Sequence, residues 1–251
     1  MSTEAPAPAA GPRERVHGLR QATLLLTRVS HPRRALLTAA GLAGTAALSG
    51  RPARETGLVL VTVLVGQSVL GWHNDLTDRR TDREAGRDGK PLASGEVEAR
   101  HAWFAMACGV LLVVPLALSN GLTAGSCYLV SLALGLAGNV VLRGSVASFL
   151  PQVAAYALYP AFLSYGGWGG QVTGSAPQPL MVVLAALLGL GVHVLASLPD
   201  LVGDHQVGRL HLPLRIALRT GAPRLLVLAG VGTALVLVGL VVAALAYGLR
   251  Q

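Results

Sequence analysis

Charged and sulfur-containing side chains are scarce in this sequence, and each shortage excludes a class of protein. Only 13% of the 251 residues are charged, 52% are hydrophobic, and the mean hydropathy is +0.56. Soluble domains carry about 25% charged residues, so this composition excludes an ordinary soluble protein. The two cysteines, Cys108 and Cys127, lie in apolar runs without metal-ligand spacing, which argues against a zinc site or a disulfide framework.

Acidic and aromatic residues are also few. The chain has 12 Asp and Glu against 20 Lys and Arg, a net charge of +8, and only three Trp, five Tyr and three Phe. Nucleic-acid-binding surfaces gather basic residues into patches among aromatic side chains, and no such patch is present in the sequence. We therefore expect no nucleic-acid partner, and we attribute the positive charge to orientation in a membrane.

Long apolar runs, by contrast, are abundant. A helix needs about 20 apolar residues to cross about 30 Å of hydrocarbon. The sequence predicts an all-α, polytopic transmembrane bundle in one domain, residues 21–251, after a disordered, Ala- and Pro-rich leader over residues 1–20. Seven spans are predicted, near residues 35–50, 56–73, 101–119, 121–142, 147–166, 179–198 and 223–247.

The basic residues predict which side of the membrane each connection faces. With the N-terminus inside, Arg51, Arg54 and Arg250 fall outside, and the other 17 of the 20 Lys and Arg fall inside. Basic residues of short connections concentrate on the cytoplasmic face. We therefore expect a multi-pass plasma-membrane protein whose acidic segments, after the second and sixth spans, both face the cytoplasm.

These two acidic segments carry the chemistry of the sequence. Asn74, Asp78 and Asp82 recur every four residues, with Asp75 between the first two, and the pair Asp200 and Asp204 repeats the spacing. On a helix such residues share one face, where like charges repel and where carboxylates near a bilayer are costly. A divalent cation removes that cost, and Mg²⁺ binds through one or two carboxylates together with substrate phosphates.

A simpler interpretation is that the first segment is a solvated loop. Its acids would then pair with the neighbouring arginines, Arg79, Arg80, Arg83 and Arg87. Two Asp-x-x-x-Asp clusters at span ends on the same side favour a metal–diphosphate site instead, because acids at a membrane are functional by default.

Four segments, in order along the chain, resemble motifs of the UbiA superfamily of intramembrane prenyltransferases. They are NDLTDRRTD (74–82), KPLASGEV (90–97), LRGSVASFLPQVAAYALYPAF (142–162), which is similar to actinobacterial members, and LPDLVGDHQVG (198–208). The likeness extends from about residue 28 to residue 230.

The resemblance implies a Mg²⁺-dependent transfer of a prenyl group from an isoprenyl diphosphate to an aromatic or other lipophilic acceptor. It implies that Asp78, Asp82, Asp200 and Asp204 are catalytic. Asn74, Asp78 and Asp82 would bind one Mg²⁺, and Asp200 with Asp204 the other, while the direction of Asp75 stays open. It places Lys90, Arg143 and, more weakly, Arg28 at the diphosphate. Arg143 has an equal alternative as a positive-inside anchor.

Three departures from the family pattern qualify these expectations. Ser197 stands where many members have a further Asp, and Gly138 with Asn139 replaces a frequent Tyr. The family typically has nine spans, so the resemblance implies that the last two helices are missing here. That leaves a wide opening to membrane lipid, a partner subunit or a decayed remnant of the enzyme, and homo-oligomerisation is an open expectation.

Other functions stay open at this point. A membrane terpene cyclase would use the same site without an acceptor, although the few aromatic rings argue against a demanding cyclisation. A non-catalytic membrane subunit fits the missing spans. A cation transporter would place its acids near span centres, whereas these lie at span ends on one side. The acceptor and the prenyl chain length are not set by any pattern in the sequence.

Overall fold

The computed structural model describes residues 23–87, 89–167 and 174–247, and the regular elements in these ranges are all helical. The predicted all-α fold is therefore confirmed. The leader predicted over residues 1–20 lies outside the described residues, as does Arg250.

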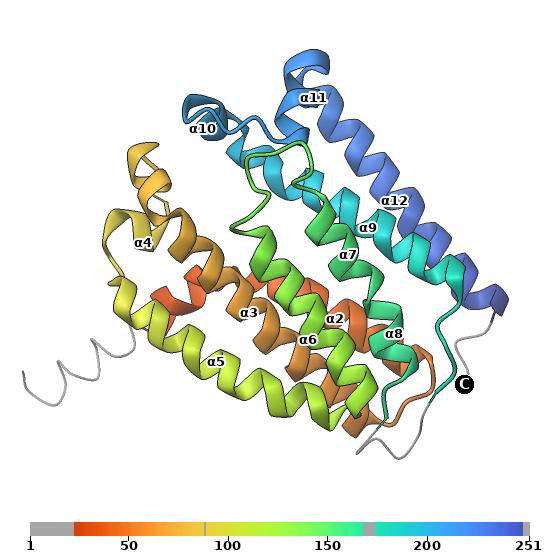
Figure 1. The fold of residues 1–251 in the computed structure, drawn as a ribbon. Coiled ribbons are helices and arrows are strands. Elements are labelled where there is room, and N and C mark those ends of the chain that lie inside the picture. The colour runs from red at the N-terminus through yellow and green to blue at the C-terminus, as the bar shows by residue number, and fades with distance from the viewer. Residues whose placement is uncertain (1–22, 88, 168–173, 248–251) are drawn as a thin grey trace, which may run out of the picture.

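The helices form one elongated bundle (Figure 1). A first helical stretch covers residues 23–29. In chain order there follow α2 (Pro32–Leu48), α3 (Ala53–Glu84), α4 (Pro91–Ser94), α5 (Ala99–Ser119), α6 (Leu122–Gly138), α7 (Leu150–Ala157), α8 (Tyr159–Ser164), α9 (Pro179–Ser197), the 3₁₀ turn η2 (Leu198–Asp200), α10 (Leu201–Gln206), α11 (Leu212–Thr220) and α12 (Ala222–Tyr247).

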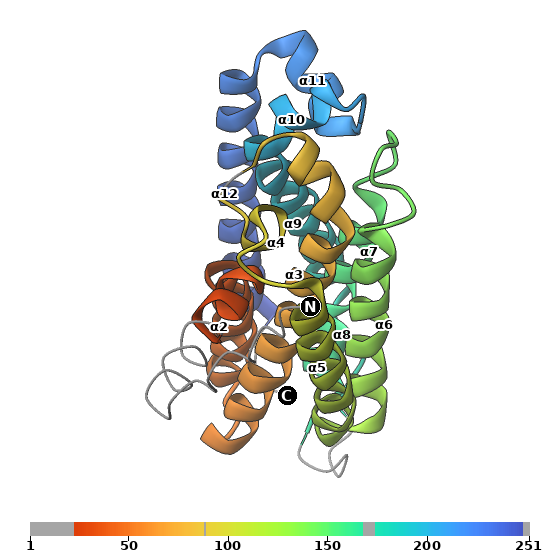
Figure 2. The same ribbon diagram turned by 90° about the vertical axis from the view of Figure 1, so that its left-hand side faces the viewer.

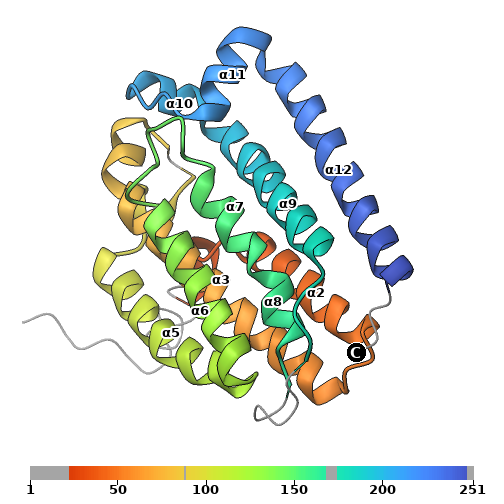
Figure 3. The same ribbon diagram turned by 45° about the vertical axis from the view of Figure 1, so that its right-hand side comes forward.

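The long helices pack as neighbours in a continuous series. α3 packs against α2 and α5, α6 against α5 and α7, and α9 lies between α7 and α12. α12 is at the edge of the bundle, beside α9 (Figure 3). The C-terminal end of α3, the α6–α7 connection, α10 and α11 gather at the same end of the molecule (Figure 2).

The seven predicted spans coincide with helices, but length and hydropathy support fewer. Among the described residues, four helices are long and apolar enough to cross a membrane: Ala53–Glu84, Ala99–Ser119, Pro179–Gln206 and Ala222–Ala246. α2 and α6 have 17 residues each. The predicted fifth span is two short helices, α7 and α8, because Pro160 has no N–H with which to continue α7. The count of seven is not confirmed by these criteria.

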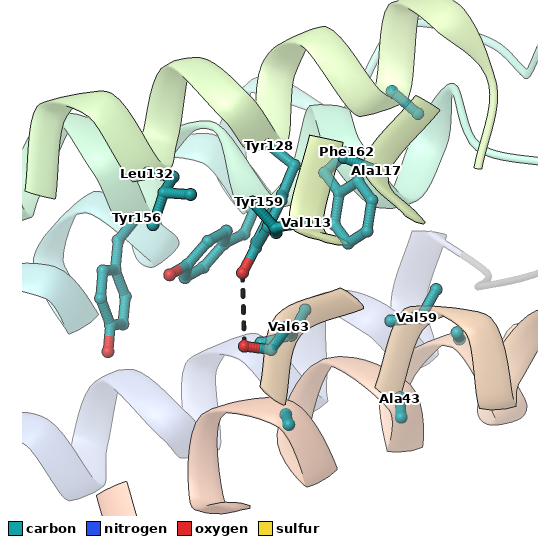
Figure 4. Packing of buried hydrophobic residues seen from close by; sticks show 13 residues of the cluster. Ala43, Val59, Val63, Val113, Ala117, Tyr128, Leu132, Tyr156, Tyr159 and Phe162 are labelled. Atoms are coloured by element: carbon teal, nitrogen blue, oxygen red, sulfur yellow. Dashed lines mark hydrogen bonds between the residues drawn. The ribbon is translucent and has the colours of Figure 1, made fainter. Parts of the chain in front are cut away.

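The apolar core lies where α2, α3, α5, α6 and the α7–α8 pair meet (Figure 4). Tyr128 of α6 is its largest fully buried side chain; its hydroxyl donates to the Val63 carbonyl at 3.3 Å, and its ring centroid is 5.0 Å from that of Phe162. A Cβ at position 66 would lie 2.1 Å from the Tyr128 hydroxyl oxygen. Glycine at position 66 of α3 therefore allows α3 and α6 to approach closely.

Apolar side chains also cover the outside of the bundle. Leu111 of α5 is 76% exposed and Leu245 of α12 is 79% exposed. An exposed apolar surface over whole helices is typical of contact with lipid and not with water.

α3 links this apolar bundle to the acidic residues. Its 32 residues correspond to about 48 Å at 1.5 Å per residue, which exceeds the ~30 Å of a hydrocarbon layer. Val59 and Val63 are buried near its start, and Asp75, Asp78 and Asp82 are buried near its end. One helix therefore carries the first acidic segment beyond the apolar part of the bundle on its inward face.

Candidate functional site

The first acidic segment forms a buried row on α3. Asp75, Asp78 and Asp82 are 2%, 0% and 2% exposed, so the three- and four-residue spacing places them on one inward face as predicted. Asn74 lies beside them and donates from its amide Nδ2 to Asp75 Oδ1 at 3.3 Å.

The second acidic segment follows directly on α9. Pro199 lies at the start of η2, and Asp200 ends this 3₁₀ turn, immediately before α10. Asp204 points inward from α10 and is 7% exposed, whereas the Asp200 side chain is 34% exposed.

Arg87 joins the two segments across the bundle. Its Nη1 lies 2.9 Å from Asp82 Oδ1 and 2.8 Å from Asp200 Oδ1, and its Nη2 donates to the Asp200 carbonyl at 3.2 Å. A Cβ at position 203 would lie 2.4 Å from Arg87 Nη2, so Gly203 leaves the space that the guanidinium occupies. Residues more than 110 positions apart therefore share one cation.

Lys90 adds a second link within the first segment. Its Nζ lies 2.9 Å from Asp82 Oδ2 and 3.3 Å from Asp75 Oδ1. Burial alone lowers the pKa of the Lys90 ammonium, but the nearby carboxylates of Asp75, Asp82 and Asp78 outweigh it and raise the pKa above its ordinary value. The side chain is therefore held in its charged form, as a phosphate-binding residue requires.

Two further arginines surround Asp78. Arg143, in the connection between α6 and α7, donates from Nη2 to Asp78 Oδ2, and Arg209 Nη1 lies 3.3 Å from Asp78 Oδ1. Arg209 also donates from Nη2 to the Thr81 hydroxyl at 2.8 Å. Arg143 Nη1 is buried and has no hydrogen-bond partner among the described residues. Arg143 therefore retains a buried donor, and its role at a diphosphate stays a prediction.

Not every predicted residue joins the cluster. Arg28 is exposed, and within the described ranges no hydrogen bond or ion pair connects it to the five aspartates. Its role at a diphosphate stays a prediction. Asp75 is turned toward His31, whose Nε2 lies 3.0 Å from Asp75 Oδ1.

The interpretation of the first segment as a solvated loop is wrong. Its aspartates are buried, and of the four neighbouring arginines Arg87 is the one whose ion pair with them is seen within the described ranges. Arg80 pairs instead with Glu84 at 2.8 Å, and Arg83 donates to the Ala93 carbonyl at 3.2 Å.

The donor set fits hard cations such as Mg²⁺. Within the described residues, no three Asp, Glu, His or Cys side chains converge closely enough to hold an ion by themselves. Mg²⁺ does not need three, because it retains waters and binds through one or two carboxylates plus substrate phosphates. Asp82 and Asp200 already meet at a single nitrogen of Arg87, so carboxylates of both segments are within reach of one bridging group.

Sequence reasoning missed four members of this cluster. Arg87 was expected only as a loop partner, and Arg209, His31 and His211 were not expected at all. The signal for Arg209 is its place just after Gly208, a few residues beyond the Asp-x-x-x-Asp pair. His211 Nε2 lies 3.0 Å from Asp204 Oδ2, a contact that depends on the turn before α11.

A small cavity of about 50 Å³ lies on the bundle side of the cluster. Asn74 and Asn139 line it at the cluster end. Its walls farther in mix apolar surface with polar side chains, which are those of Arg34, Gln67, Ser131, Gln152, Tyr156 and Tyr159. The cavity therefore places hydrogen-bonding groups beside Asn74, inside an otherwise apolar bundle.

These features define a class of protein: a membrane-spanning helical bundle with two facing aspartate motifs at one end. Residues 35–250 match the model of the UbiA prenyltransferase family, and the chain belongs to this family. The resemblance drawn from the four sequence segments is thereby confirmed.

Solved structures of a UbiA homologue from Archaeoglobus fulgidus share the fold. The structure bound to GPP and Mg²⁺ has a TM-score of 0.63 and 19% identity, over 86% of this chain and 76% of the homologue. The structure bound to DMAPP and Mg²⁺ has a TM-score of 0.63 and 19% identity, over 85% and 75%. A further structure of the homologue gives 0.62 and 16%, over 87% and 86%. No curated protein matches the chain.

Proposed function

We propose that the protein is a Mg²⁺-dependent intramembrane transferase that moves a prenyl group from an isoprenyl diphosphate to an aromatic or other lipophilic acceptor. Membership of the UbiA prenyltransferase family supports the coarser statement, a membrane enzyme that uses prenyl diphosphates. The finer statement rests on the chemistry of the aspartate cluster.

The observation that carries the proposal is the convergence of the two aspartate motifs on Arg87. Asp82 of α3 and Asp200 of η2 lie 2.9 and 2.8 Å from the same guanidinium nitrogen. Lys90, Arg143 and Arg209 complete a set of cations around the carboxylates. A diphosphate needs such cations, and carboxylates are useful beside it only when divalent ions bridge them to the phosphates.

Mg²⁺ is the proposed ion, and two solved UbiA structures hold it together with GPP or DMAPP. In this chain Asn74, Asp78 and Asp82 would hold one ion, and Asp200 with Asp204 the other. When bound, Mg²⁺ supplies neutralisation of the charge that develops on the departing diphosphate.

The protein's own side chains bind and orient the substrates. Lys90, Arg143 and Arg209 donate to phosphate oxygens, and Arg143 Nη1 is already a buried donor with no partner among the described residues. The apolar interior of the bundle would keep water from the allylic carbon as its C–O bond breaks. The cavity beside Asn74, which polar side chains help to line, is the proposed place for the head of the acceptor.

The orientation in the membrane is also part of the proposal. The strong bias of Lys and Arg toward one side supports a plasma-membrane protein whose aspartate cluster faces the cytoplasm. Isoprenyl diphosphates would then reach the cluster from that side, and membrane lipid would surround the apolar helices.

The test is a product assay on purified, detergent-solubilised protein. Geranyl, farnesyl and geranylgeranyl diphosphate are each supplied with and without Mg²⁺, and with and without aromatic or quinone-precursor acceptors. Mg²⁺-dependent diphosphate release that requires an acceptor, with a prenylated product, is the expected result. Release of a hydrocarbon or terpene alcohol without acceptor would replace the transferase with a cyclase, and no release in any condition would contradict both.

Glu84→Gln is the matched control variant for this assay. Glu84 is an acid of the same helix α3, but it is exposed and pairs with Arg80 outside the cluster. We expect its activity to equal that of the wild type.

A further inference from the structure

His211 is a buried histidine attached to the second aspartate motif, and the proposed function gives it no role. It is 5% exposed and lies immediately before α11. Its Nε2 lies 3.0 Å from Asp204 Oδ2. Because the ring and the carboxylate are both buried and in direct contact, their positions relative to each other are fixed.

The hydrogen bonds of the ring fix the position of its proton. His211 is the N-cap of α11, and its Nδ1 accepts a hydrogen bond from the Leu214 backbone N–H at 3.3 Å. A nitrogen that accepts carries no hydrogen, so this hydrogen bond places the ring hydrogen on Nε2. Nε2–H therefore donates to Asp204 Oδ2.

This donation leaves the two oxygens of Asp204 in different situations. Oδ2 is held by His211, whereas Oδ1 lies 3.8 Å from Arg209 Nη1 and 4.0 Å from Arg87 Nη2. Those two guanidiniums also contact Asp78 and Asp82 of the first motif. Asp204 Oδ1 thus faces the two guanidiniums at long range, with no hydrogen bond to it among the described residues.

The turn between α10 and α11 is built to bring His211 back to Asp204. Gly208 has φ +72°, a conformation that favours glycine, and the Arg209 N–H donates to the Asp204 carbonyl at 2.8 Å. Beyond the turn, Pro213 and Leu214 are buried and α11 packs against α12. The imidazole is therefore anchored on a packed helix, and not on a free loop.

We propose that His211 is a positioning residue for metal binding: its Nε2–H holds Asp204 in the orientation that presents Oδ1 to a divalent cation. The inference rests on the proposed function, since it requires Asp204 to be a ligand. Partners that orient metal ligands typically account for about 10- to 100-fold in metal affinity.

Two substitutions separate this role from helix capping. His211→Asn keeps a side-chain acceptor for the Leu214 N–H, because asparagine is a favoured N-cap, but it is too short to reach Asp204. His211→Gln loses the cap and keeps an amide N–H near the position of Nε2. His101→Asn, at an exposed site in α5, is the control for a histidine substitution elsewhere.

The experiment measures Mn²⁺ binding by electron paramagnetic resonance in detergent, with inorganic pyrophosphate present, alongside thermal unfolding. We expect His211→Asn to bind Mn²⁺ about 10- to 100-fold more weakly with little change in melting temperature, and His211→Gln to stay within about threefold of the wild type.

Three other results would contradict the positioning role of His211 or the metal site on which it depends. If His211→Asn binds Mn²⁺ as tightly as the wild type, or His211→Gln binds as weakly as His211→Asn, the positioning role is wrong and the ring only caps and packs. If the wild type itself binds no Mn²⁺ with pyrophosphate, the metal site fails, and the proposed function fails with it.

Discussion

The two aspartate motifs are chemically alike but are carried by different kinds of structure. The first lies on α3, one continuous helix of 32 residues, with its three aspartates buried. The second lies on a 3₁₀ turn and a six-residue helix, and the Asp200 side chain is 34% exposed. The first motif is therefore a rigid platform, and the second depends on local hydrogen bonds and on neighbours such as Arg87 and His211 for its position.

Asp78→Ala is expected to have the largest effect, because it removes the centre of the rigid motif. Asp78 is 0% exposed; its loss would remove the carboxylate that pairs with Arg143 and one of the two that pair with Arg209. Breaking a buried ion pair in this way costs roughly 3–5 kcal/mol. We expect turnover to be abolished and the melting temperature to fall, while membrane insertion is retained. Product formation, unfolding and membrane fractionation are the measurements, and full activity would contradict the assignment.

Asp204→Ala should abolish turnover as well, but with a smaller effect on stability. Without Asp204 the buried Nε2 of His211 loses its hydrogen-bond partner. One unsatisfied buried group of this kind lowers the free energy of unfolding by about 1–3 kcal/mol. Removal of one electrostatic contact to a developing charge costs about 100-fold or more in rate. The comparison is made by measuring diphosphate release and thermal unfolding side by side with Asp78→Ala. An equal loss of stability in the two variants would refute the distinction between a rigid and an adjustable motif.

Substitutions of Gly71 and Gly203 test further whether the first motif is more rigid than the second. A Cβ at position 71, on α3, would lie 2.4 Å from the Ser30 carbonyl oxygen, which is backbone, whereas a Cβ at position 203 would meet the far end of Arg87. Overpacking against fixed atoms costs about 1–3 kcal/mol, so Gly71→Ala should lower the melting temperature clearly.

Gly203→Ala should instead act mainly on function, and this is the smallest effect expected. The flexible Arg87 side chain can move, so stability should change by less than about 1 kcal/mol, while its contacts with Asp82 and Asp200 weaken. Diphosphate release should fall several-fold at limiting Mg²⁺. A Gly203→Ala protein that loses as much stability as Gly71→Ala would mean that the second motif is as rigid as the first.

Local spacing predicted the parts of the site that one helix determines. The row Asp75, Asp78 and Asp82 follows directly from helical geometry, and the meeting of the two segments follows from their position at span ends on one side. Lys90 and Arg143 were placed by resemblance, and the structure brings both to the carboxylates.

What the sequence did not predict depends on backbone turns and on tertiary contacts. His31 reaches Asp75 from a left-handed conformation with φ 53°, which is uncommon for a residue other than glycine. His211 and Arg209 reach Asp204 and Asp78 only because the chain turns at Gly208. The break at Pro160 divides an apolar run that hydropathy alone presents as continuous.

One measurement tests the central claim, that the two motifs form a single cation–diphosphate site. Mn²⁺ is titrated into the wild type, Asp82→Asn and Asp200→Asn, with and without inorganic pyrophosphate, and binding is followed by electron paramagnetic resonance. The account predicts that pyrophosphate tightens Mn²⁺ binding in the wild type and that either substitution weakens it at least about tenfold, as loss of a ligand or its partner does. Binding that ignores pyrophosphate, or that survives either substitution unchanged, would contradict a shared site.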